Sequence, residues 1–115
     1  MRKVTPKSVT DDATNYTRLL KPLLTSYANN EIDKKTLHKR LSKIRESITR
    51  TIADTYKVKE NKAAITLLRE GLRHFLNAVH LLKVGTSVVY NVDSEQFASE
   101  MKKGGECIKR GIERL

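Results

Sequence analysis

Apolar residues recur at steps of three and four in four separate stretches of the chain, and this period constrains the fold more than any other feature. The steadiest stretch follows Asp33, a residue type suited to helix N-caps, and supports a helix to about Tyr56. Its apolar positions are Leu37, Leu41, Ile44, Ile48 and Ile52. Side chains at this spacing share one face of an α-helix, so the stretch predicts an amphipathic helix.

The first of the other three stretches begins at Ser8, which with Asp11 has the spacing of a capping box. Its apolar face comprises Ala13, Tyr16, Leu20, Leu23 and Tyr27. Pro22 falls inside this face and removes a backbone donor, so we expect the helix to kink or restart near Lys21. Asn29 and Asn30 are expected to end the helix.

The third stretch is the most apolar, and we expect a helix from Glu60 or Asn61 to Lys83, with Gly85 at its end. One seam comprises Ile65, Leu68, Leu72, Phe75, Val79 and Leu82, and a second face holds Leu67, Ala78 and Leu81. Two apolar faces need two partners. This helix is therefore expected to be central in the fold or to serve an oligomer interface.

The fourth stretch follows a connection at 86–92 and is expected to be capped by Asp93 or Ser94. Its predicted buried face comprises Phe97, Met101, Ile108, Ile112 and Leu115. Three glycines, Gly104, Gly105 and Gly111, lower its helix propensity and would let another backbone approach closely.

Together the four stretches predict an all-α protein, an antiparallel four-helix bundle formed by a single domain over 8–115. Residues 1–7 are basic and polar without a helical period, so they are expected to form a short flexible arm. A single cysteine, Cys107, permits no internal disulfide. No apolar run is long enough to span a membrane and no secretory signal is visible, so we expect a cytoplasmic protein without membrane contact.

The net charge of +10 concerns partners more than fold. The excess lies outside 91–115, where five basic residues balance five acidic ones. The second helix holds the densest cluster, since 34–45 contains six basic residues and no acidic one. On a helical projection most of these cations lie opposite the apolar face. The candidate nucleic-acid-binding residues are Lys34, Lys35, Lys39, Arg40, Lys43, Arg45 and Arg50.

Cations along one helix can follow a line of phosphates, and each neutralised phosphate releases counterions. We therefore expect a small, basic, non-enzymatic protein that contacts the DNA or RNA backbone without base-specific readout. Aromatic residues are only 5% of the chain, too few for a base-stacking platform. The third helix is too apolar to be the recognition helix of a helix-turn-helix motif. The competing interpretation is an ordinary solvated face.

Two alternatives remain. The first is an interaction subunit that joins a larger assembly or a homo-oligomer through the third or fourth helix. The second depends on Arg73 and His80, which lie seven residues apart on one helix face. This stretch resembles the Arg and His motif of HEPN-type ribonucleases, which are small helical proteins. The resemblance implies metal-independent RNA cleavage with His80 as acid or base and Arg73 on the phosphate.

The remaining polar residues indicate no other chemistry. His74 and His80 point in different directions on a helix and Cys107 has no second thiol, so no metal site is expected. No Gly-rich phosphate loop follows a strand, and no paired carboxylates suggest acid and base catalysis. We therefore predict no cofactor and no catalytic residue in the primary interpretation.

Overall fold

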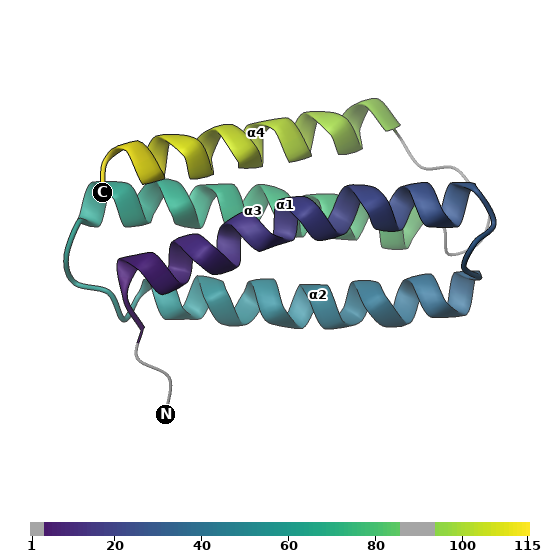
Figure 1. The fold of residues 1–115 in the computed structure, drawn as a ribbon, viewed down its shortest axis with the longest axis horizontal. Coiled ribbons are helices and arrows are strands. Elements are labelled where there is room, and N and C mark those ends of the chain that lie inside the picture. The colour runs from purple at the N-terminus through teal and green to yellow at the C-terminus, as the bar shows by residue number, and fades with distance from the viewer. Residues whose placement is uncertain (1–3, 86–93) are drawn as a thin grey trace.

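A computed structural model describes residues 4–85 and 94–115 and contains, within those ranges, four α-helices and no strand (Figure 1). The helices are α1 (Pro6–Ala28), α2 (Lys34–Thr55), α3 (Lys62–Gly85) and α4 (Ser94–Glu113). In Figure 1 α1 and α3 run to the right while α2 and α4 run back to the left. The all-α helical bundle expected from periodicity is confirmed. The expected connection at 86–92 and the Asp93 cap lie outside the described residues.

The start of α1 differs from the sequence expectation. The helix begins at Pro6, and Thr5, not Ser8, is its N-cap. The Thr5 hydroxyl accepts from the Ser8 amide at 3.1 Å, and the Ser8 hydroxyl accepts from the Thr5 amide at 2.9 Å. Proline suits the first helical position because the amide it lacks has no partner there. Pro6 and Lys7 therefore belong to the helix, while residues 1–3 of the expected arm are not described.

The α1 helix does not restart near Lys21, because it is continuous from Pro6 to Ala28 with Pro22 inside it. Pro22 has no amide hydrogen, so the helical bond from residue 22 to the carbonyl of Arg18 cannot form. Pro22 is exposed, and the missing bond lies on the surface. The helix ends as expected, with Asn29 as C-cap and Asn30 at a φ of 60°.

The α2 helix has the bounds that the sequence indicates. The Asp33 carboxylate accepts from the Thr36 amide at 2.7 Å. The side chain and then the backbone of Thr36, both as hydrogen-bond donors, hold the pKa of Asp33 below its ordinary value. The helix ends at Thr55, with Tyr56 as C-cap. The next helix starts at Lys62, just after the predicted Asn61, which has a φ of 53°.

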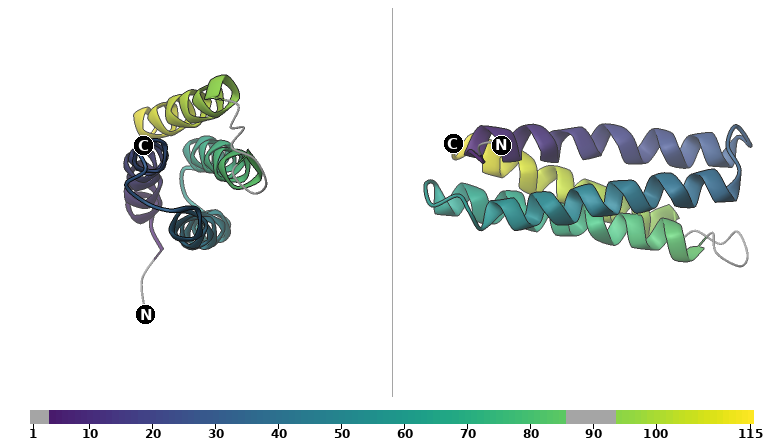
Figure 2. Two further views of the ribbon diagram at one scale, coloured as in Figure 1. Left: turned by 90° about the vertical axis from the view of Figure 1, so that its right-hand side faces the viewer. Right: turned by 90° about the horizontal axis from the view of Figure 1, so that it is seen from below.

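The central position expected for α3 is confirmed, since it packs against each of the other three helices. The α4 helix lies on α3 and α1, and within the described part of the chain it does not contact α2. Figure 2 shows this in cross-section, with α4 and α2 on different sides of α3. The fully buried side chains that fill the centre are Leu20, Leu37, Leu41, Ile48, Leu68, Leu72, Phe75 and Leu82.

Glycines make the contact between α3 and α4 close, and we call this contact the α3/α4 seam. A Cβ added to Gly71 would lie 2.8 Å from the carbonyl oxygen of Gly104, and one added to Gly111 would lie 3.1 Å from that of Ala64. The close approach expected at Gly104 and Gly111 is thus made by α3 of the same chain. Gly105, in contrast, faces open space.

The end of α4 is less buried than its apolar pattern suggests. Phe97, Met101 and Ile108 are buried as expected, but Ile112 and Leu115 are 42% and 48% exposed. The expectation that these two residues are buried is wrong. Ile112 lines an open hollow between α1 and α4, together with Thr14, Thr17 and Arg18.

Candidate functional site

All seven cations predicted on α2 are exposed: Lys34, Lys35, Lys39, Arg40, Lys43, Arg45 and Arg50. Their exposure follows from how α2 folds, because its buried residues face α1 and α3 and leave the opposite side to solvent. Four of them lie on that opposite side, and we call these the α2 basic face: Lys35, Lys39, Lys43 and Arg50.

The cations in the middle of α2 lack carboxylate partners. Within 4–85 and 94–115, neither Lys39 nor Lys43 forms an ion pair, and the same holds for Arg40, Arg45 and Arg50. Asp54 lies one turn from Arg50 on α2. The structure instead places the Asp54 carboxylate 3.5 Å from the ammonium of Lys57. The cations of the α2 basic face therefore form no ion pair among the described residues.

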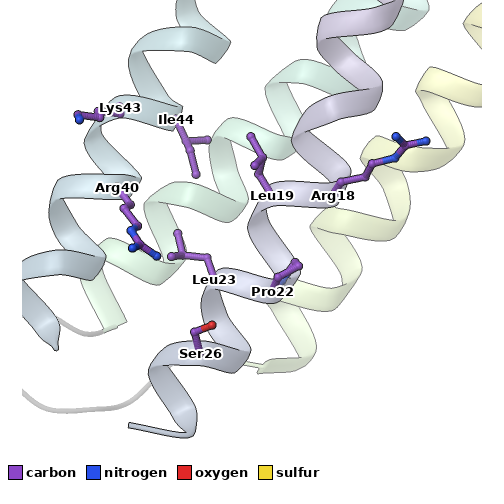
Figure 3. A pocket seen from close by; sticks show the side chains of 8 residues that line it. All are labelled: Arg18, Leu19, Pro22, Leu23, Ser26, Arg40, Lys43 and Ile44. Carbon is purple, nitrogen blue, oxygen red and sulfur yellow. The ribbon is translucent and has the colours of Figure 1, made fainter. Parts of the chain in front are cut away.

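The seven predicted residues do not all share one surface. Arg40 lies nearer to α1 and, with Lys43, lines an open groove between α1 and α2 (Figure 3). The groove has a volume of about 360 Å³ and its lining residues are Arg18, Leu19, Pro22, Leu23, Ser26, Arg40, Lys43 and Ile44. We call this the α1/α2 groove. It adds Arg18, an exposed cation that sequence reasoning missed because its relation to α2 depends on tertiary packing.

Figure 3 shows how the groove residues are oriented. The side chains of Leu19 and Ile44 project toward each other across the space between the helices. Arg40 extends along the gap toward Leu23, while Arg18 and Lys43 point outward on opposite sides. The groove thus combines an apolar floor with cations at its edges.

Arg73 and His80 are both exposed, and no contact joins them within the described residues. Arg73 donates to the hydroxyl of Tyr56 at 3.1 Å. Arg69, beside it, donates from Nε to the Thr55 hydroxyl at 2.8 Å and stacks 3.8 Å from the centre of the Tyr56 ring. Arg73 and Arg69 thus link the end of α2 to α3.

Sequence reasoning missed a polar contact that bridges α3 and α4. Nδ1 of His74 lies 2.6 Å from Oε2 of Glu100, and the Asn77 amide donates to the same oxygen at 3.5 Å. The contact is half-buried and joins residues that are 26 positions apart, so no local pattern could reveal it. Further along the same seam, burial and then the charge of Glu70 raise the pKa of the Cys107 thiol. A raised pKa disfavours the reactive thiolate.

The described part of the chain contains no group of three or more His, Cys, Asp or Glu residues arranged to hold a metal ion. None of its helices has the length and apolar character that crossing a bilayer requires. Comparisons with protein-family models, with curated proteins and with solved structures found no significant match to this chain. The exposed cations of α2 and the α1/α2 groove are the candidate functional surfaces of the described chain.

Proposed function

We propose that the α2 basic face binds the phosphate backbone of nucleic acid without reading the base sequence. The observation that carries this proposal is the set of exposed cations between Lys39 and Arg50 that have no carboxylate partner among the described residues. Lys35, Lys39 and Lys43 follow each other at intervals of four residues, about 6 Å along the helix axis. Such a row can follow a line of phosphates.

Binding to the phosphate backbone fits this fold better than base reading by a helix-turn-helix motif. The helix-turn-helix mode requires one helix that is free to enter the major groove. The α3 helix is the central element of this fold and packs against each of the other three helices. Long cationic side chains on one exposed helix therefore support affinity from counterion release and leave bases unread.

A salt titration with duplex DNA tests the proposal. If about four phosphates are neutralised, the log of affinity should fall against the log of salt concentration with a slope near −3.6. In the Lys39→Ala, Lys43→Ala and Arg50→Ala triple variant the slope should become shallower by about 2.7, because each contact contributes about 0.9. Single-stranded DNA and RNA, titrated in parallel, identify the preferred form.

A matched control removes the same charge from α4. Lys102, Lys103 and Lys109 are all exposed there, and their triple-alanine variant should retain the wild-type slope. Failure of the wild-type protein to retard any nucleic acid at low salt would overturn the proposal. If both triple variants lost affinity and salt dependence equally, binding would depend only on net charge, and the assignment to α2 would likewise be overturned.

A further inference from the structure

We propose that the α1/α2 groove is a docking site for an acidic amphipathic helix of a partner protein. The groove is the seam between α1 and α2 on the side away from α3. The α4 helix leaves it open, because α4 packs on α3 and α1 and does not contact α2 within the described residues. Here two neighbouring helices present a continuous hollow into which the side chains of another helix can fit.

The floor of the groove provides apolar contacts. Leu19 is 43% exposed although it is a large hydrophobic residue, and Ile44 is only partly buried. These two side chains project toward each other in Figure 3. Their exposed surface would be removed from water by leucines of a helix seated between them. Helices bind such grooves through apolar residues at i, i+3 or i+4, and i+7.

The edges of the groove determine the charge of the occupant. Arg40 and Lys43 stand on the α2 side of the groove, and in the described structure neither forms an ion pair. Arg18 lines the α1 side, with its side chain directed outward in Figure 3, and it forms no ion pair within the same residues. No acidic residue lines the groove. Carboxylates on both flanks of a docked helix would complement these cations, and charge complementarity of this kind fixes partner choice and register.

The size of the groove fits a short helical contact. On α1 the lining residues extend from Arg18 to Ser26, which is about 12 Å along the axis. Two to three turns of a partner helix can lie along this length. Pro22 lies at the middle of this wall, so an imperfectly bonded part of α1 faces the same space.

This proposal does not rest on nucleic-acid binding. The groove shares Lys43 with the α2 basic face, but Leu19, Arg18 and Arg40 lie outside that face. Of these, Leu19 carries no charge, so substitutions at Leu19 test the groove without removing a cation. The Lys39 and Arg50 positions test the basic face alone, since neither lines the groove.

The probe is a helical peptide of about 18 residues, roughly five turns, with leucines on one stripe and glutamates along both flanks. Its binding to the full chain is measured by fluorescence anisotropy, and the site is mapped by amide chemical shifts in isotope-labelled protein. We expect saturable binding with the largest shifts on α1 from Arg18 to Ser26 and on α2 from Arg40 to Ile44. Peptides with lysine in place of glutamate, or with the same residues in scrambled order, should not bind.

Leu19→Glu should weaken the acidic peptide by about tenfold or more, because it replaces an apolar contact with a repelling charge. Val84→Glu is the matched control, because Val84 is also an exposed hydrophobic residue but lies at the end of α3. Arg18→Glu and Arg40→Glu should each weaken the peptide, and Arg114→Glu on the exposed end of the chain should not. Circular dichroism shows whether each variant keeps its helical content.

Several outcomes would overturn the proposal. The acidic peptide binding no better than the scrambled one, or shifts centred away from the groove, would each do so. Arg18→Glu and Arg40→Glu, both at exposed positions, give a second test if Leu19→Glu fails to fold. Vesicles containing phosphatidylserine provide the last test. If the protein binds these vesicles through Leu19 but does not bind the peptide, the groove is a site for a lipid surface and the proposal is overturned.

Discussion

Two contacts between amphipathic helices in this molecule differ in how closely the helices pack. At the α3/α4 seam, glycines bring two backbones together and the His74 and Glu100 pair closes one edge. At the outer side of α1 and α2, larger side chains keep the helices apart, and an open groove remains with Arg40 at its edge. Small residues let the two helices approach closely at the α3/α4 seam, whereas leucine, isoleucine and proline side chains line the α1/α2 groove.

Removing a large side chain from each contact should give the largest difference in the free energy of unfolding between the two. Phe75 is fully buried and fills the space against Gly104, so Phe75→Ala should lower the free energy of unfolding by about 3–5 kcal/mol. Leu19→Ala, at the open groove, should change it by no more than about 0.5 kcal/mol. Chemical denaturation measures both. Similar losses at the two positions would mean that the groove is part of the core.

Pro22→Ala should stabilise the protein, because a proline inside a helix is less favourable than alanine by up to about 3 kcal/mol. The α1 helix continues through this exposed position, so nothing prevents the alanine amide from completing the helical bond. Thermal unfolding should shift to higher temperature. A loss of stability would show that the local geometry at Pro22 is required by the fold, which would count against an adaptable groove wall.

The glycines give a matched pair within the bundle. A Cβ at Gly71 would lie 2.6 Å from the Ile108 side chain and 2.8 Å from the Gly104 carbonyl, so Gly71→Ala should destabilise by about 2 kcal/mol despite its better helix propensity. Gly105→Ala meets no atom within 4 Å and should stabilise by about 1 kcal/mol. Denaturant midpoints with an unchanged slope would measure both. If both substitutions changed the free energy of unfolding in the same direction, the close packing at the α3/α4 seam would be contradicted.

The smallest expected effect is a pH dependence of stability caused by His38, which lies on the edge of α2 away from the groove. Burial, and then the charges of Lys34 and Lys83, lower the pKa of His38 from its ordinary 6.5. The unfolded chain therefore takes up the proton first as the pH falls. Above about pH 6.5, His38 does not lower the free energy of unfolding. As the pH falls from there through the pKa of His38 in the folded protein, the free energy of unfolding declines.

His38→Gln should remove this part of the pH dependence and leave stability at about pH 8 nearly unchanged. Comparing unfolding free energies of the two proteins at about pH 8 and pH 5 measures it. Arg18→Ala serves as control, because Arg18 is not among the charges that act on His38. An unchanged pH profile in the His38 variant would show that this residue is not the source.

Local signals accounted for the helices and for much of the surface. Asp33 predicted the start of α2 because a cap acts over three residues. The helical projection predicted a solvent-facing stripe opposite the apolar face, and its residues Lys35, Lys39, Lys43 and Arg50 are exposed. The start of α1 was misplaced because Ser8 and Asp11 satisfy the same pattern as Thr5 and Ser8. At Pro22 the expected restart was wrong, since a proline on the solvent side leaves the helix continuous.

The sequence by itself determined where the helices lie and which faces are apolar, because both depend on contacts within a few residues. Only the tertiary structure decided which faces meet. Gly104 has a close partner because Gly71 of α3 reaches it, and Leu19 faces Ile44 across the groove (Figure 3) because α1 packs against α2. Side-chain shape across a contact selects among possible helix pairings, and it acts between residues that are far apart in the chain.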